Sequence, residues 1–392
     1  MMIPRYEPTY SFAEINRSLS HSLRGTRAEV LKSCLRDYFQ VRHVFLMKSG
    51  RSSLYVILKA LNRPGRVLMP AYNCRNVPES AWFAGYQPFL LDPDPTTLNV
   101  HPEKYIEAMI EDVSAIFAIS LFGIPYDVRP LLDAARQKRI LVVEDAATAM
   151  GGRIDGRFAG TIGDVGVISF QDTKLLSANT GGVIITNDDQ LAQRIGTFLE
   201  NVKTESGIWR NYLSTMFHKV ATRRWIYPFT QAAHRLLNGE AMYEIVPAPA
   251  GAAPGYLAKC SAFTVELILN QWQDLERNIA RRRWIAGRYT QALDHHPVFQ
   301  TPIIPAGVEP VWIQYPLLVE KKLEFYKYMQ QRGVDITWSH RYSCAEEFDQ
   351  KDCPNAEIIA RSILSLPCYP DLADAEVEKI CRMTVKYANG SG

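Results

Sequence analysis

A lysine and a hydroxyl lie five residues apart in the segment 169–174, which reads SFQDTK. The apolar run 165–170 predicts a strand that ends near Ser169, and the pair Gly181-Gly182 follows Lys174 before another apolar run. A lysine held at a strand end in low-dielectric surroundings can have a lowered pKa and act as an amine nucleophile. The Ser169 hydroxyl can hydrogen-bond a phosphate. The alternative is a solvated loop lysine, which is the usual state of a single lysine.

A carboxylate stands at the end of a second apolar run, in the sequence VVEDAA at 142–147. Ligands of open α/β sheets bind at the carboxyl ends of the strands. Asp145 in such a place can pair with a protonated ring nitrogen. The alternatives are a helix N-cap and a metal ligand.

A turn of small residues precedes a predicted helix at 48–54, which reads KSGRSSL. A helix N-terminus presents free backbone N–H groups and the positive end of the helix dipole, and both suit a phosphate. The alternative is an ordinary capped helix start.

The elements that must position these residues alternate along the first half of the chain. Short apolar runs separated by helical patterns predict an α/β domain with a mainly parallel sheet. The later strands follow one another closely, so some hairpin pairing is expected. The predicted strands are 67–69, 88–92, 115–120, 140–143, 165–170 and 182–186.

The second half has a different pattern. One long helix is predicted over 262–293, with Gln271, Leu275, Asn278 and Arg282 recurring along it. A smaller α/β pattern follows, with strands at 312–319 and 334–338 and a helix at 321–332, and the chain closes with the segment 364–367 and a last helix from residue 374. A chain of 392 residues is long for one core. We therefore expect a large domain at 1–250 and a smaller one at 251–392.

Composition excludes several classes of protein. A net charge of +3 gives no reason to expect a nucleic-acid partner. The seven cysteines are widely spaced, with no CxxC pair, so reduced thiols in a cytoplasmic protein are expected. The first residues show no signal peptide, no apolar run reaches membrane-span length, and no metal site is predicted.

Taken together in order and spacing, these segments resemble those of fold-type-I enzymes that use pyridoxal phosphate (PLP), and in detail the DegT/DnrJ/StrS family of sugar aminotransferases. The likeness covers roughly residues 44–200 and 255–385. The segments that carry it are SGRSSL at 49–54, PAYNC at 70–74, EDAATAMGG at 144–152, GTIGDVGVISFQDTK at 160–174, TGGVIITND at 180–188, NQWQDLERNIARRRWIAGRY at 270–289 and LSLPCYPDLADAEVEKI at 364–380.

The resemblance implies a role for each matching residue. Lys174 would form the Schiff base with PLP and move protons, and Asp145 would keep the pyridine nitrogen protonated so that the ring is an electron sink. Ser169 would bind the phosphate. The turn formed by Gly50, Arg51 and Ser52 would hold the same phosphate through its backbone amides.

Four features depart from the family pattern. Thr148 stands where Gln is usual, and Cys74 stands where an aromatic ring often stacks on the cofactor, so Tyr72 or another residue would substitute as the platform. Leu257 replaces an Asn that reaches the phosphate of the neighbouring subunit. Residues 203–250 are longer than the family pattern and match none of it.

The resemblance implies a homodimer with active sites at the interface. It also implies transfer of an amino group, usually from glutamate, to a keto group of a nucleotide-linked sugar. Dehydratases of the family replace the lysine with His, so Lys174 argues against that reaction. Other amine chemistry, another acceptor and a non-catalytic regulator remain open.

The segment 203–250 mixes basic and aromatic residues. Leu213, Met216, Phe217 and Val220 fall at helical spacing. Packing at the dimer interface or a lid over the active site is favoured. The alternative is contact with an anionic membrane surface by an otherwise membrane-free protein.

Overall fold

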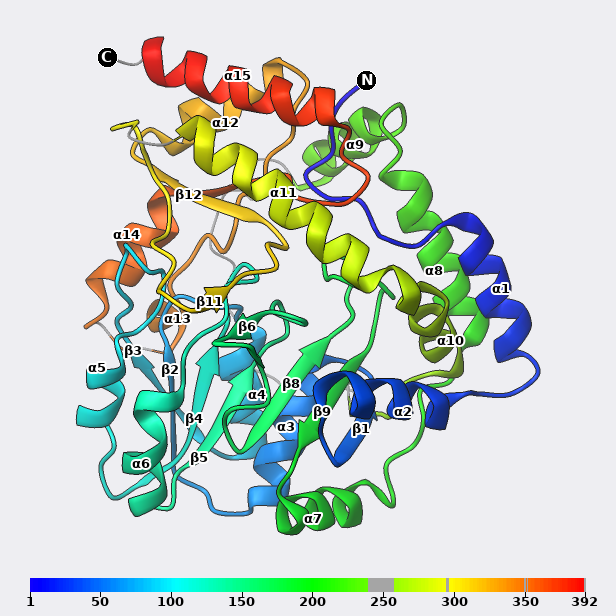
Figure 1. The fold of residues 1–392 in the computed structure, drawn as a ribbon, viewed down its shortest axis with the longest axis vertical. Coiled ribbons are helices and arrows are strands. Elements are labelled where there is room, and N and C mark those ends of the chain that lie inside the picture. Colours follow the sequence, from blue (N-terminus) through cyan, green and yellow to red (C-terminus); the bar gives the residue numbers. More distant parts are fainter. Residues whose placement is uncertain (239–256, 294–295, 349, 351, 391–392) are drawn as a thin grey trace.

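Seven short apolar runs pair into one central sheet in the order β1-β9-β8-β5-β4-β2-β3 (Figure 1). The computed structural model describes residues 1–238, 257–293, 296–348, 350 and 352–390. The strands are β1 (His43–Met47), β2 (Arg66–Pro70), β3 (Gln87–Leu91), β4 (Val113–Ile119), β5 (Leu141–Asp145), β8 (Val165–Ser169) and β9 (Gly182–Thr186).

Strand direction brings the predicted site residues to one edge of this sheet. Strands β3, β2, β4, β5 and β8 are parallel neighbours, so their carboxyl ends lie together. Strand β9 runs antiparallel to β8 and to β1, and its first residue, Gly182, pairs with Ser169 on one side and Met47 on the other. The sheet edge therefore collects Asp145, Ser169 and the turn that follows Met47.

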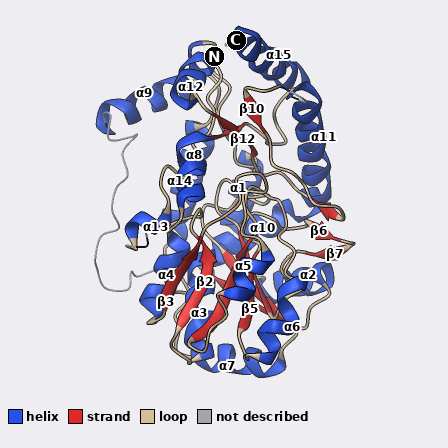
Figure 2. Ribbon diagram, turned by 90° about the vertical axis from the view of Figure 1, so that its left-hand side faces the viewer, coloured by secondary structure: helices blue, strands red, loops and turns tan. Residues whose placement is uncertain are grey.

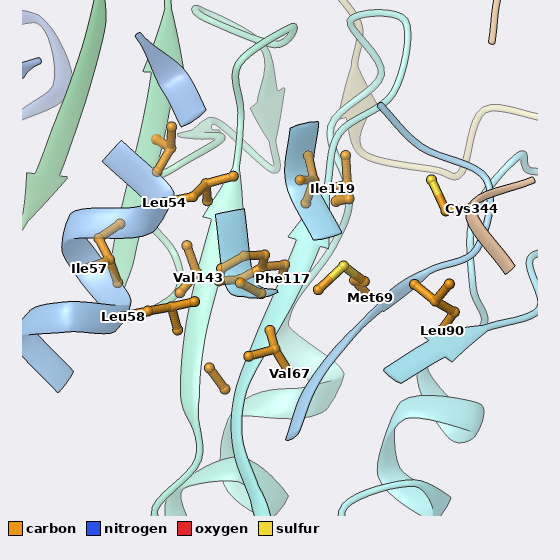
Figure 3. Close-up of a cluster of buried hydrophobic side chains, with 14 of the residues drawn as sticks. Leu54, Ile57, Leu58, Val67, Met69, Leu90, Phe117, Ile119, Val143 and Cys344 are labelled. Carbon is orange, nitrogen blue, oxygen red and sulfur yellow. The ribbon is translucent and has the colours of Figure 1, made fainter. Parts of the chain in front are cut away.

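Both faces of the sheet are covered by helices, because successive side chains of the buried strands point to opposite faces and join apolar clusters on each. On one face, helices α3 (Gly50–Leu61), α4 (Asn76–Ala84) and α7 (Asp189–Leu199) pack on the sheet. Figure 3 shows Leu54 and Leu58 of α3 close to Phe117 of β4 and Val143 of β5.

The opposite face is covered by two groups of helices (Figure 2). Helices α5 (Pro102–Glu107) and α6 (Arg129–Gln137) pack on β4 and β5. Helices α1 (Phe12–Ser22), α2 (Ala28–Phe39) and α10 (Ala262–Gln271) share a cluster with Ile168 of β8 and Val183 of β9. Helix α10 thus comes from the second half of the chain and covers the sheet of the first half.

The C-terminal part forms a three-stranded antiparallel sheet, β10 (Phe299–Gln300), β12 (Tyr315–Val319) and β13 (Ile363–Leu366). Helices α11 (Leu275–Leu293), α12 (Lys322–Gln331) and α15 (Asp374–Gly390) share an apolar cluster with this sheet, whereas α13 (Cys344–Glu347) and α14 (Pro354–Ser362) join the cluster of α3 and the central sheet. A small rim sheet joins the two halves, because β11 (Val308–Glu309) pairs with β6 (Arg153–Ile154), which pairs with β7 (Arg157–Phe158).

The fold class is the predicted one, α/β with a mostly parallel sheet and closely spaced antiparallel strands at one side. Three local predictions differ from the structure. The strand at 334–338 is wrong, since Val334 and Thr337 each form only an isolated bridge. The helix at 262–293 is interrupted by a 3₁₀ turn at Trp272–Asp274, and the strand at 312–319 begins only at Tyr315. The domain boundary at residue 250 stays a prediction.

Candidate active site

A cavity of about 800 Å³ opens at the carboxyl edge of the central sheet. Residues from both halves of the chain line it, from the turn before α3 to the segment after α12. Of the eight predicted site residues, seven line this cavity: Gly50, Arg51, Cys74, Asp145, Thr148, Ser169 and Lys174.

Lys174 lies in the loop between β8 and β9 and reaches the cavity. Its backbone N–H donates to the carbonyl of Gln171 at 2.8 Å, which closes the turn. Burial lowers the pKa of the Lys174 amine, while nearby Cys74 and Asp145 oppose the shift. A lowered pKa increases the share of neutral amine, the form that attacks a carbonyl.

The lysine loop is held from behind by the polar residues that recur along the second-half helices. Gln271 Nε2 donates to the carbonyl of Ser177 at 2.8 Å, and Asn278 Nδ2 donates to the carbonyl of Leu175 at 2.5 Å. Buried Arg282 donates in turn to Asn278 Oδ1 at 2.7 Å. The recurring polar residues Gln271, Asn278 and Arg282 therefore position the loop that carries Lys174.

Asp145 is the last residue of β5 and is 5% exposed. Burial raises the pKa of its carboxyl, and the hydrogen bond from the Ala147 N–H and the charge of Lys174 oppose that shift. Oδ1 accepts from Ala147 at 3.0 Å. Such a carboxylate favours a cationic partner in the cavity, as a protonated ring nitrogen would be.

Ser49 caps helix α3, so the first turn of that helix lies against the cavity. A Cβ on Gly50 would lie 3.4 Å from Ser169 Cβ and 3.7 Å from its Oγ, within the cradle that the two residues form. This cradle fits a phosphate that receives the Ser169 hydroxyl and backbone N–H groups at a helix N-terminus. Ser52 does not line the cavity. Its N–H donates to Ser49 Oγ at 3.1 Å within the helix cap.

Thr148 and Cys74, which depart from the family pattern, both line the cavity. Their surroundings limit the contacts that either side chain can make with a ligand. The Thr148 hydroxyl donates to the carbonyl of Ser120 and accepts from the Gly123 N–H at 3.1 Å, so it braces a neighbouring turn. Burial raises the pKa of the Cys74 thiol. Tyr72, the suggested substitute for a stacking ring, is fully buried outside the cavity, and its hydroxyl donates to the carbonyl of His340 at 3.2 Å.

One wall of the cavity, supplied by the C-terminal half, was not predicted. Trp338, His340 and Tyr342 line the cavity, as does Phe122 from the first half, so several rings are available beside the cofactor site. Burial and the charge of Lys174 lower the pKa of His340 to about 4, which keeps its imidazole neutral near pH 7. The dense run TWSHRYS at 337–343 was the signal that could have identified this wall.

The remaining cavity walls carry more cations than anions. Lys48, Arg51, Arg75 and Arg341 line the cavity together with Lys174. Glutamate side chains form ion pairs with three of these cations, Lys48, Arg51 and Arg75. Glu205 Oε1 is 3.2 Å from Lys48 Nζ, and Glu79 lies 2.9 Å from Arg75 Nε and 4.0 Å from Arg51 Nη1.

The unmatched segment forms two helices in its described part, α8 (Ile208–Ala221) and α9 (Tyr227–Asn238). Leu213, Phe217 and Val220 are exposed, whereas Met216 packs against the core beside α1 and α10. No described residue of 203–238 lines the cavity, and 239–250 lie outside the described residues. Leu257 packs partly buried against the core cluster of α3. Within the described chain no helix has the length and apolarity to cross a membrane.

Comparisons with known proteins identify the family of this chain. Residues 7–385 match the DegT/DnrJ/EryC1/StrS aminotransferase family. The spore coat polysaccharide biosynthesis protein SpsC of Bacillus subtilis is 25% identical over 373 residues, covering 91% of this chain and 88% of that protein. A dTDP-4-dehydro-2,3,6-trideoxy-D-glucose 4-aminotransferase of Saccharopolyspora spinosa is 27% identical over 347 residues, covering 86% and 82%.

Solved structures share the fold over nearly the whole chain. DesV of S. venezuelae, solved in complex with a ketimine intermediate, has a TM-score of 0.79 at 20% identity and covers 99% of this chain and 98% of that one. The sugar aminotransferase CalS13 of Micromonospora echinospora has a TM-score of 0.79 at 19% identity, covering 98% and 100%. The chain belongs to the DegT/DnrJ/EryC1/StrS family of PLP-dependent aminotransferases.

Proposed function

We propose that this protein binds PLP on Lys174 and transfers an amino group from glutamate to a keto group of a nucleotide-linked sugar. The observation that carries the proposal is the meeting of three groups in one cavity: the amine of Lys174, the buried carboxylate of Asp145 and the cradle of Gly50 and Ser169. These match the aldehyde, ring nitrogen and phosphate of PLP. When bound, PLP supplies an electron sink for the bond-breaking at the amino donor.

Each residue has a task that its surroundings support. Asp145 holds a proton on the ring nitrogen, because a buried carboxylate without a cation is costly. Ser169 and the first turn of α3 fix the phosphate end. Burial lowers the pKa of Lys174 and so favours the neutral amine, the form that attacks a carbonyl and then moves protons.

The cation-rich walls support anionic substrates. Arg51, Arg75 and Arg341 line the cavity together with Lys174, and guanidinium groups bind carboxylates and phosphates in a bidentate manner. Glutamate carries two carboxylates and a nucleotide-linked sugar carries a diphosphate. One relative acts, by its name, on a dTDP-linked keto sugar.

We also propose that the protein is a cytoplasmic homodimer. All seven cysteines are free thiols, which suits a reducing compartment. Helices α8 and α9 expose Trp209 (58%), Leu213 (62%), Phe217 (65%) and Phe229 (74%). Trp209, Leu213 and Phe217 are spaced four residues apart along α8 and so lie on one face of it, and an exposed apolar face is typical of a protein interface. Packing against a second copy is the favoured explanation and membrane contact is the alternative.

The test is a half-reaction with purified protein loaded with PLP. Glutamate should convert the bound cofactor to its amino form, seen as loss of visible absorbance, and should release one equivalent of 2-oxoglutarate per site. A dTDP- or UDP-linked keto sugar should then restore the absorbance. Failure of every α-amino acid to change the absorbance of a protein that does bind PLP would refute the transferase proposal.

A further inference from the structure

Helix α8 contacts the loop that carries Lys174 at two points. His218 Nδ1 lies 2.5 Å from Asp172 Oδ2, two residues before the lysine. Ser214 Oγ accepts from Asn179 Nδ2 at 2.9 Å, five residues after it. These two residues of α8 are one helical turn apart, so a single rigid face of the helix holds both ends of the loop.

The carboxylate that His218 meets is buried and has few other partners. Asp172 is 7% exposed, and its Oδ1 accepts from the Tyr10 hydroxyl at 3.1 Å. The contact with Asp172 raises the pKa of His218 despite partial burial of the ring. Removing the imidazole would leave a buried carboxylate with one neutral donor, which favours movement of the loop toward water or another cation.

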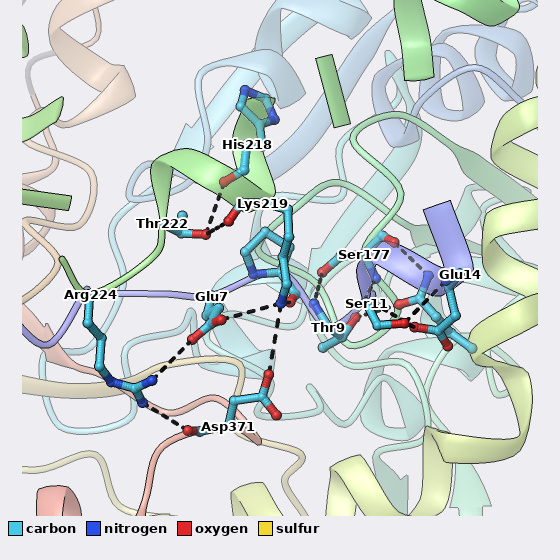
Figure 4. A network of polar contacts seen from close by, with 12 residues as sticks. Glu7, Thr9, Ser11, Glu14, Ser177, His218, Lys219, Thr222, Arg224 and Asp371 are labelled. Atoms are coloured by element: carbon cyan, nitrogen blue, oxygen red, sulfur yellow. Dashed lines mark hydrogen bonds and ion pairs between the residues drawn. The ribbon is translucent and has the colours of Figure 1, made fainter. Parts of the chain in front are cut away.

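Ion pairs attach the C-terminal end of helix α8 to the N-terminal segment, as Figure 4 shows. Lys219, the residue after His218, is buried, lies 3.3 Å from Glu7 Oε1 and donates to the carbonyl of Pro8 at 3.0 Å. Arg224, just beyond the helix, lies 2.7 Å from Glu376 Oε1. The N-terminal segment reaches the same loop, since the Ser177 N–H donates to Thr9 Oγ1 at 3.0 Å. Movement of α8 would therefore be transmitted to the lysine loop.

We propose that His218 is a positioning residue, which holds Asp172 and through it the loop that presents Lys174 to the cofactor. The proposal rests on the function proposed above, because it assigns a task in presenting the same lysine. It also gives the unmatched segment a role, since α8 braces the reactive loop from outside the cavity.

Four variants isolate this role. His218→Leu removes the donor and keeps much of the volume, whereas His218→Asn retains an N–H donor near the position of Nδ1. Asp172→Asn removes the charge of the partner, and the double variant His218→Leu/Asp172→Asn tests whether the two act together. Val220→Ala, on the exposed side of α8, is the matched control for a truncation in this helix.

The first measurement uses the protein without cofactor, so it does not depend on turnover. Competitive labelling with acetic anhydride over a range of pH, followed by mass spectrometry, gives the pKa and reactivity of the Lys174 amine. The second measurement separates kcat from KM for glutamate in the PLP-loaded enzyme. Far-ultraviolet circular dichroism confirms that each variant is folded.

We expect His218→Leu to alter the labelling rate of Lys174 at least about threefold and to lower kcat roughly tenfold, with KM within about twofold, because small misplacements of a reacting group are costly. His218→Asn should recover most of both values, and the double variant should be no worse than His218→Leu. Unchanged labelling and kcat in His218→Leu, or an Asn variant as impaired as the Leu variant, would overturn the proposal. A wild type that binds PLP but does not react with glutamate would refute the transferase function alone, and the labelling would still decide the role of His218.

Discussion

The position of the phosphate cradle depends on a close contact that a single methyl group would break. A Cβ on Gly182, the first residue of β9, would lie 2.3 Å from the carbonyl carbon of Ser49 and 2.6 Å from Gly50 N. Ordinary contact begins near 3.4 Å. In Gly182→Ala the turn before α3 must therefore shift by about 1 Å, since both sides of the contact are backbone.

The expected losses follow from the size of that shift. Overpacking of this kind costs about 1–3 kcal/mol of the free energy of unfolding. Moving backbone N–H groups off a phosphate loses charge-assisted hydrogen bonds of about 1.5–3 kcal/mol, which raises the Kd for PLP roughly 10- to 150-fold. Gly182→Ala should therefore lose both stability and affinity.

Two further glycine variants separate these effects. In Gly50→Ala the new methyl group would meet Ser169 Cβ at 3.4 Å, an ordinary contact, so the apo-protein should stay within about 1 kcal/mol of wild type while PLP affinity falls. Gly287→Ala, on α11 with no atom within 4 Å, should gain about 0.5–1 kcal/mol and keep its affinity. The stability is measured by urea unfolding and the affinity by PLP titration. The reasoning fails if Gly182→Ala binds PLP as wild type does, or if Gly50→Ala loses more stability than Gly182→Ala.

Three other predictions address the site and the surface. Lys174→Ala should remove the Schiff-base absorbance band of the PLP-loaded protein, and borohydride should fix the cofactor covalently on Lys174 of the wild type; mass spectrometry that finds the label on another lysine would contradict the assignment. Asp145→Asn should lower kcat at least about 100-fold while phosphate-driven loading of PLP changes far less, because the ion pair with the ring nitrogen supports the chemistry more than the binding; a kcat within a few-fold of wild type would exclude that pairing. If the proposed homodimer forms through α8, Leu213→Ser combined with Phe217→Ser should shift it toward monomer in sedimentation velocity, and a wild-type protein that is monomeric but sediments with anionic vesicles at low salt would favour the membrane alternative.

Much of the site could be predicted because its residues follow buried strands directly. Asp145 and Ser169 end strands with every residue buried, and parallel neighbours place such ends together whatever the rest of the chain does. Lys174 follows at a fixed short distance. Local sequence was therefore enough to predict that these three residues lie at one cavity, while their roles stay a prediction.

Other parts depend on long-range contacts that local patterns do not contain. The apolar residues at 334–338 suggested a strand, but Val334 meets only Ile3 and Thr337 meets only Ser365, so no ladder forms. The break at Trp272–Asp274 contains no Gly or Pro, and the helical pattern runs through it unchanged. His340 reaches the cavity only because the C-terminal half folds over the sheet edge.

The place of α10 in the core has a consequence for how the chain folds during synthesis. Phe263, Leu267 and Ile268 of α10 share one apolar cluster with strands β8 and β9, so the first 250 residues emerge from the ribosome without part of their core. At about 5–20 residues per second, translation from residue 250 to the end of α10 at residue 271 takes roughly 1–4 s. During that interval the nascent sheet exposes an apolar face. We expect this face to be the binding site for a chaperone on the ribosome, and the chain to complete its core only once α10 has been translated.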